Sequence, residues 1–281
     1  IDDRLWRELA GAGLLGLAAD PAVAGEAGAG LGPEETCAVA VELGRHLGRV
    51  PFGAHAVAAI PVLTESASVA LIERLGRPAC SGEKVLSAAF EEDLGGPPTA
   101  PATTLRADGD GFVLTGGKVN VPYASAADAL LVNAAGPEGA VVAVVDTAAA
   151  GVRLTEVAST GLTPVHLIDF DEVPVAAADI LSGGAATVLR TAHLLRLAVA
   201  ADQAGAVDGA LAATATYARE REQFGRAIGS FQAVAQRLAD GYIDAQALAL
   251  TVAQAAWLLG DEADSDAEEI ATAVATAKFW A

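Results

Sequence analysis

One short segment carries an arginine, an aromatic ring and an amide side chain at a predicted turn between two helical stretches. Residues 221–234 read REQFGRAIGSFQAV, which includes Arg221, Phe224 and Gln232. A guanidinium group is planar, permanently charged and rich in donors, so it suits a diphosphate. An arginine between two glutamates can equally form a surface ion pair. Phe224 can equally be a core aromatic, and Gln232 an ordinary polar residue at the start of a helix.

The cysteines and histidines show no spacing that is typical of a metal site. The sequence has two cysteines, Cys37 and Cys80, and four scattered histidines, without a CxxC pair. Free thiols in a reducing cytosol fit this usage best, and nothing in the sequence supports a disulfide. We therefore expect no metal and a cytoplasmic protein.

The charge of the chain limits its partners. A formal charge of −19 over 281 residues argues against nucleic-acid binding, because an acidic surface repels phosphate backbones. The ordinary reading of this charge is solubility. We find no signal peptide and no clean apolar run long enough to span a membrane. The alanine-rich stretch 194–213 is interrupted by charged residues, so it predicts a buried helix of a bundle.

Hydrophobic periodicity divides the chain into three predicted domains. Helical patterns fill residues 1–84, short β-branched runs between turn residues fill 85–182, and helical patterns return over 183–281. Because the sequence lacks methionine and stops within a helical pattern, we expect truncated ends and an incomplete last domain. The prediction is an α+β fold, mainly α, with an N-terminal helical domain, a central antiparallel β barrel and a C-terminal helical bundle.

Individual elements follow from the same periodicity and from the turn residues between them. The predicted helices cover residues 5–10, 33–45, 54–77, 185–221 and 231–259, with a further helix from residue 266. The seven predicted strands cover residues 85–90, 101–106, 112–119, 129–133, 140–145, 152–157 and 166–171.

Several motifs, in their order along the chain, resemble those of acyl-CoA dehydrogenases. Residues 5–17 resemble the second helix and following loop of that family, and residues 42–45 its E-x-G-R segment. Residues 110–118 (DGFVLTGGK) are similar to its barrel hairpin, and 170–175 to its exit from the barrel. Residues 221–234 are the most specific match, because they resemble the family's signature helix hairpin.

Within the family, one subgroup stands out. The shared segments are similar to those of the smaller subunits of actinobacterial heterotetrameric acyl-CoA dehydrogenases, which act on CoA thioesters of steroid side chains. These segments are ELGRH at 42–46 with Val50 and Pro51, DLGG at 93–96, and GKVNV at 117–121 with Tyr123 and Ala124.

The resemblance implies a flavoprotein oxidoreductase. Its reaction removes the α proton and the β hydride of an acyl-CoA, with the hydride passing to FAD and the proton to a carboxylate. The implied partners are an acyl-CoA substrate, a second acyl-CoA dehydrogenase-like subunit and an electron-transfer flavoprotein. The implied setting is fatty acid or steroid degradation, without nucleic acid or membrane.

The same resemblance assigns roles to single residues. Arg221 would bind the diphosphate of FAD held by a neighbouring subunit, Phe224 would pack at the adenine side, and Gln232 would reach the flavin. Arg196 aligns with an arginine on the helix that lines the acyl pocket. On so apolar a helix we expect Arg196 to be buried and to need a partner, and a structural ion pair is the favoured alternative.

The sequence departs from the family on the flavin-facing side of the barrel. The family's loop T-E-P-x-A-G-S-D is replaced by FEEDLGGPP at residues 90–98, whose three adjacent acids would repel CoA phosphates. On the next strand, the usual W-I-T or F-I-S is replaced by Asn120, Val121 and Pro122, and proline also lacks an amide donor. Two flavin contacts are therefore expected to be lost.

The catalytic base is also unknown. Some family members place a glutamate on the pocket helix, where this chain has Leu195, and leucine cannot accept a proton. Most place it beyond the last residue of this sequence. Either the base lies in absent sequence or this subunit has none.

Several hypotheses stay open. The chain is a subunit of an acyl-CoA dehydrogenase, a non-catalytic partner with half a flavin site, or another flavoenzyme of this architecture, such as an acyl-CoA oxidase or a flavin monooxygenase component. A helical scaffold without nucleotide is more remote. A chain with only the reaching half of a flavin site needs a different chain, which predicts one FAD per heterodimer. The plainer alternative is a homotetramer whose diverged loop binds flavin through backbone amides.

Overall fold

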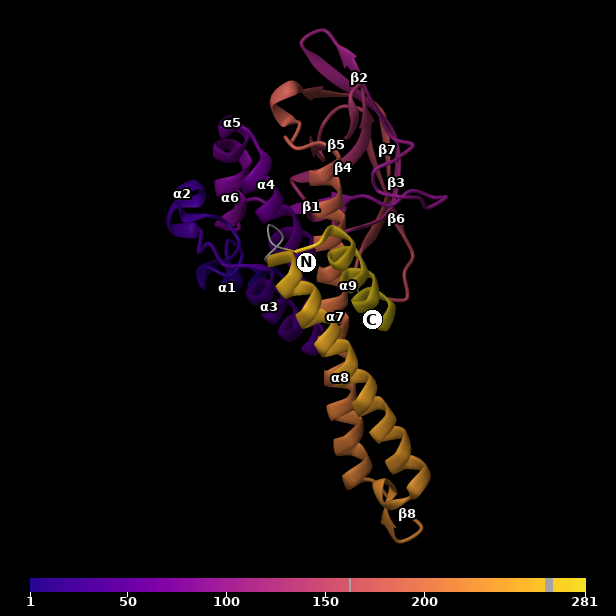
Figure 1. Cartoon of the computed structure of the whole chain (residues 1–281). Coiled ribbons are helices and arrows are strands. Elements are labelled where there is room, and N and C mark those ends of the chain that lie inside the picture. Colours follow the sequence, from indigo (N-terminus) through magenta and orange to yellow (C-terminus); the bar gives the residue numbers. More distant parts are fainter. Residues whose placement is uncertain (162, 261–264) are drawn as a thin grey trace. The chain divides into compact units, whose positions relative to one another are not determined.

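The computed structural model describes residues 1–161, 163–260 and 265–281 (Figure 1). The chain forms two compact units. The first unit comprises residues 1–31 and 49–195, and the second comprises residues 32–48 and 196–281. The division into three domains stays a prediction.

The helices of the first unit are short, apart from the start of α7. They are α1 (Asp3–Gly11), α2 (Pro21–Ala24), α4 (Ile60–Ser66), α5 (Val69–Leu71) and α6 (Arg77–Cys80), with π-helical turns at Gly53–Ala59 and Ile72–Gly76. The prediction of one helix over 54–77 was wrong. The backbone is extended at Ala67 and Ser68, and the Ser68 hydroxyl accepts a hydrogen bond from the Leu71 amide to start a new helix.

A seven-stranded sheet follows these helices, and it confirms the seven predicted strands. The strands are β1 (Leu86–Ala89), β2 (Thr104–Asp108), β3 (Gly111–Pro122), β4 (Ala129–Gly136), β5 (Gly139–Asp146), β6 (Val152–Val157) and β7 (Val165–Ala176). Their order is β1-β4-β2-β3-β7-β6, and β5 pairs with β4.

The α+β fold class is confirmed, but the sheet is mixed rather than purely antiparallel. Strand β1 runs parallel to β4 over four residue pairs, and β2 meets β4 in parallel at Thr104 and Ala135. The chain between β1 and β4 contains β2 and β3, which provide the long crossover that a parallel pair requires. Strand β4 is therefore enclosed, and residues 129–134 are all buried.

A bulge in β7 keeps its apolar side chains on one face. Residues His166, Ile168 and Phe170 are buried alternately, and then Val173 and Val175 continue the pattern one residue out of step. Glu172 has φ 50° at this point, and the pairing of β7 with β3 shifts there. An extra residue in a strand reverses the alternation, so the bulge preserves the buried face along the whole strand.

The second unit is helical. It contains α3 (Pro33–Arg45), most of α7 (Ala185–Glu220), α8 (Gln232–Gly260) and α9 (Ala267–Trp280). Helices α3 and α7 cross with their backbones in contact. A Cβ on Gly44 would lie 2.0 Å from the Asp202 carbonyl oxygen, and one on Gly205 would lie 1.8 Å from that of Val41. Only glycine permits so close a crossing.

Helix α8 corrects the prediction about apolar runs of membrane-spanning length. By length and hydropathy it would pass as a membrane span, so the expectation that no run is long enough was wrong. A core helix passes the same test, and the C-terminal half of α8 is buried at residues such as Ala245, Val252 and Ala256. The N-terminal half of α8 is less covered within this chain, and Tyr242, for example, is 57% exposed.

Candidate functional site

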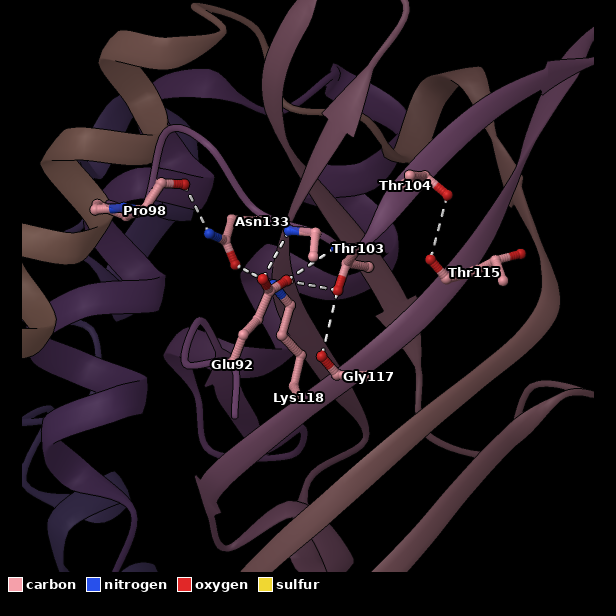
Figure 2. A network of polar contacts seen from close by, with 9 residues as sticks. Glu92, Pro98, Thr103, Thr104, Thr115, Gly117, Lys118 and Asn133 are labelled. Atoms are coloured by element: carbon pink, nitrogen blue, oxygen red, sulfur yellow. Dashed lines mark hydrogen bonds and ion pairs between the residues drawn. The ribbon is translucent and has the colours of Figure 1, made fainter. Parts of the chain in front are cut away.

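A buried lysine organises the barrel side of the candidate site (Figure 2). The Lys118 side chain is fully buried on β3, and its Nζ lies 2.7 Å from Glu92 Oε1 and 2.7 Å from Asn133 Oδ1. The Asn133 amide group donates to the Pro98 carbonyl oxygen at 2.7 Å. The Glu92 carboxylate also accepts bonds from the backbone amides of Ala102 and Thr103, at 2.6 and 2.9 Å.

This network lowers the pKa of Glu92. Burial alone would raise the pKa, but the hydrogen bonds from Lys118, from the amides of Ala102 and Thr103 and from the Thr103 hydroxyl outweigh it and lower the pKa to about 2. Burial lowers the pKa of Lys118, and Glu92 opposes that shift. The carboxylate is therefore ionised and fully engaged inside the barrel.

The diverged loop between β1 and β2 is tied to the sheet at several points. Glu92 and Pro98 join it to the Lys118 network, and Glu91 Oε2 accepts a hydrogen bond from Asn120 Nδ2 at 2.8 Å. The Val119 amide donates to the Glu91 carbonyl oxygen. Both carboxylates are therefore engaged within the chain, and Lys118 neutralises the charge of Glu92, whereas the amide donor of Asn120 leaves the charge of Glu91 in place.

The signature segment forms a small hairpin at the end of α7. Strands β8 (Glu222–Gln223) and β9 (Arg226–Ala227) pair antiparallel, and the Ile228 amide donates to the Arg221 carbonyl oxygen at 2.8 Å. The turn residues Phe224 and Gly225 both have positive φ, 54° and 75°. A two-residue turn of this kind matches the twist of the paired strands but strains a bulky residue such as phenylalanine.

An aromatic pair marks the hairpin tip. The Phe224 side chain is 93% exposed and meets Phe231 edge-on, with ring centroids 6.2 Å apart. The core alternative for Phe224 was therefore wrong. Arg226 lies over the Phe231 ring, 4.1 Å from its centroid. Gln232 is exposed at the first residue of α8, close along the chain to this pair.

The arginines of the hairpin are not neutralised within the chain. Arg221 and Arg226 are exposed, and among the residues that the structure describes no carboxylate lies within ion-pair distance of either. The alternative that Arg221 pairs with a flanking glutamate was therefore wrong. The hairpin presents two unpaired guanidinium groups and an aromatic ring to solvent.

Leu195 and Arg196 are consecutive residues of α7, and the structure does not bring their side chains together in one site. Arg196 is exposed rather than buried, and it has no ion pair with any described residue, so both expectations for its burial and its partner were wrong. A cavity of about 400 Å³ lies among α3, α7 and α8, and neither residue lines it. Its lining includes Cys37, Val41 and Val252.

The cysteines are free and buried, which confirms the prediction of free thiols. Burial raises the pKa of Cys37 to about 12, so its thiol stays protonated and unreactive. Within the described ranges no three His, Cys, Asp or Glu side chains are grouped so as to hold a metal ion.

Sequence reasoning missed three residues that the structure brings forward. Lys118 was read only as part of a hairpin motif, and Asn133 as part of a strand. Both are buried polar residues in apolar strands, which is a signal that a partner must exist. Arg226 was read only as part of the signature segment, although it is the second unpaired cation of that segment.

Comparisons with known proteins all point to one family. A model of the acyl-CoA dehydrogenase C-terminal domain matches residues 182–281. Acyl-CoA dehydrogenase FadE27 of Mycobacterium tuberculosis is 41% identical over all of this chain and 74% of its own length. FadE28 of the same organism is 34% identical over 94% of this chain and 74% of its own length.

Solved structures give the same result. The ChsE4-ChsE5 complex from Mycobacterium tuberculosis matches with a TM-score of 0.91 and 39% identity, over 100% of this chain and 73% of that chain. The Tcur3481-Tcur3483 steroid ACAD matches with a TM-score of 0.88 and 38% identity, over the same shares of the two chains. The first is named as a complex of ChsE4 with ChsE5, and the second carries the names of two proteins, Tcur3481 and Tcur3483.

Proposed function

The chain belongs to the acyl-CoA dehydrogenase family of FAD-binding oxidoreductases, and from this membership we propose that it is one subunit of a heteromeric acyl-CoA dehydrogenase. Its substrate class is the CoA thioesters of steroid side chains. Similarity to two-subunit complexes, one of them a steroid enzyme by name, supports both parts of the proposal.

The observation that carries the proposal is the contrast between the two halves of a flavin site. The hairpin offers Arg221, Phe224 and Gln232, all exposed and without internal ion pairs among the described residues, so it fits the diphosphate and adenine side of FAD. On the barrel side, Glu91 and Glu92 are engaged with Asn120 and Lys118. The chain is therefore suited to reach towards a flavin that a different subunit holds.

The residues of this chain would act by binding and positioning. A guanidinium at Arg221 would hold the diphosphate through charge-assisted hydrogen bonds. When bound, FAD accepts the hydride equivalent from the acyl thioester. Neither Leu195 nor an engaged, low-pKa Glu92 can serve as the base, and the proposal assigns that role to the partner subunit. Arg196, exposed on α7, is retained as a proposed contact to the acyl-CoA.

Complementation tests this function. The chain, its candidate partner subunit and the co-purified pair are each assayed with a steroid side-chain CoA ester, a short-chain acyl-CoA and an electron-transfer flavoprotein or an artificial acceptor. The proposal expects activity from the pair, with preference for the steroid ester, and none from this chain alone. Activity of this chain alone would support the homotetramer alternative and contradict the proposal.

The proposed partners are thus an acyl-CoA, a second acyl-CoA dehydrogenase-like subunit and an electron-transfer flavoprotein. A cytoplasmic location stays a prediction.

A further inference from the structure

The hairpin carries positive charge to which the proposed function assigns no role. Four of the 17 lysines and arginines in this chain of charge −19 lie between residues 219 and 237. Two of them, Arg221 and Arg226, belong to the hairpin itself, whereas Arg219 is on α7 and Arg237 is on α8. A local group of cations on a strongly acidic chain is a site where an anion is stabilised.

Hydrogen bonds of the hairpin fix the backbone around its two arginines. Gln223 and Arg226 are direct partners across the ladder, so their side chains project to the same side. Arg221 precedes Gln223 by two positions, and its carbonyl continues the ladder by accepting from Ile228. Alternation places Glu222 on the face opposite to Gln223 and Arg226, and Arg221 is the residue at which α7 passes into this hairpin, because its amide still donates to the Tyr217 carbonyl oxygen.

The Arg226 side chain is also held in place. Its guanidinium lies over the Phe231 ring, which also packs in a T-shaped arrangement with the Phe224 ring. A guanidinium stacked on a ring keeps its in-plane N–H donors available for an anion, and stacking reduces the entropy lost on binding. Phe224 is held in the left-handed region at 93% exposure, a strained conformation that is typical of ligand-contacting residues.

We propose that Arg226 is a second diphosphate-binding residue, which together with Arg221 forms a two-arginine clamp at the hairpin. The inference rests on the proposed function, because the diphosphate is that of the FAD held by the partner subunit. Two guanidinium groups match a diphosphate, which carries a charge on each phosphate. Phe231 is the platform that positions Arg226 and does not itself contact the phosphates.

The test uses the complex with the partner subunit, stripped of flavin and titrated with FAD. Arg226→Gln should weaken FAD binding about ten- to a hundredfold, the range for one lost hydrogen bond to a charged group. Arg226→Lys keeps the charge but loses the planar set of N–H donors, so its affinity for FAD should lie between those of the wild type and Arg226→Gln. Arg237→Gln is the matched control, because it removes the same charge from α8 outside the hairpin, and it should bind FAD as the wild type does.

Competition separates a phosphate contact from a structural effect. ADP and adenosine are used to displace FAD from the wild-type and Arg226→Gln complexes. A phosphate contact predicts that the substitution weakens ADP and leaves adenosine unchanged, whereas equal loss for both ligands would overturn the inference. If Arg221→Ala weakens FAD binding but Arg226→Gln binds FAD as tightly as Arg237→Gln does, the two-arginine clamp is wrong and the proposed function stands. If neither hairpin variant affects FAD, the proposed function fails as well.

Discussion

Two cationic regions of this chain use their charge in opposite ways. In the barrel, Lys118 is fully buried and bound by Glu92 and Asn133. At the hairpin, Arg221 and Arg226 are exposed, and within the described part of the chain no acid pairs with them. The donors of Lys118 are used by acceptors within the chain, whereas the guanidinium donors at the hairpin remain available to a ligand.

The difference separates structural charge from binding charge. A buried lysine without its acceptors would be costly, so the Lys118 network must persist in the folded chain whatever else binds. Exposed arginines cost little to leave unpaired, so they contribute little to folding. Substitutions in the barrel network should therefore reduce stability, and those in the hairpin should reduce ligand binding.

The largest expected effect is at the buried lysine. Lys118→Met removes the cation and leaves the Glu92 carboxylate and the Asn133 carbonyl group without their shared donor. Breaking a buried pair in this way costs about 3–5 kcal/mol. Urea unfolding of the purified chain measures the loss.

The matched control is Lys84→Met. Lys84 also forms a 2.7 Å ion pair, with Asp128, but its side chain is 46% exposed. A surface pair contributes about 0–1 kcal/mol. Equal losses for the two methionine variants would show that burial does not distinguish the two lysines.

The second effect is on the pH dependence of stability. Glu92 has a pKa of about 2 in the fold against an ordinary 4.5, so it contributes stability above pH 4.5 that is lost as the pH falls towards 2. The difference corresponds to about 3 kcal/mol. The lowered pKa of Lys118 does not alter this window, since Lys118 stays protonated in it.

Unfolding of the wild type and Glu92→Gln is compared between pH 5.5 and pH 3. The stability gap between them should narrow as the pH falls. A gap that is constant over this range would mean that the Glu92 carboxylate is not held as described.

A third, smaller effect tests the crossing of α3 and α7 in the second unit. Gly205→Ala places a Cβ against the Val41 carbonyl oxygen and should cost about 1–3 kcal/mol, because the helices must separate. Gly241→Ala on α8 is the control. Its Cβ would make an ordinary 3.5 Å contact with Leu211, so gained helix propensity should stabilise the chain by up to about 1 kcal/mol. Thermal unfolding should therefore shift in opposite directions for the two variants.

The smallest effect on stability is expected at the hairpin. Arg221→Ala should change the free energy of unfolding by at most about 0.5 kcal/mol, because the side chain is exposed and unpaired. In the complex it should nonetheless weaken FAD binding about ten- to a hundredfold. Full flavin occupancy of the variant complex after extensive dialysis would contradict the role of Arg221.

Local patterns predicted the elements well, because hydrophobic periodicity and turn residues act over short distances. All seven strands and the long helices α7 and α8 are found where the sequence indicated. A turn between two helices was predicted at residues 221–234 from the resemblance of that segment, but the paired strands β8 and β9 within it were not predicted. The break at Ala67 and Ser68 was missed, although serine at position 68 is a residue type that commonly begins a helix.

Features that depend on distant residues could not be predicted in the same way. Lys118 and Glu92 are 26 positions apart and meet only after the loop folds onto β3. The parallel pairing of β1 with β4 depends on the crossover through β2 and β3. The burial of Arg196 was misjudged because an apolar helix still has one face in solvent.

Flavin stoichiometry tests the central claim most directly. Flavin absorbance and protein concentration are measured for this chain alone and for its complex with the partner subunit, after gel filtration. The account predicts no retained FAD in the chain alone and one FAD for each pair of unlike chains in the complex. One FAD per chain in the purified protein alone would contradict it.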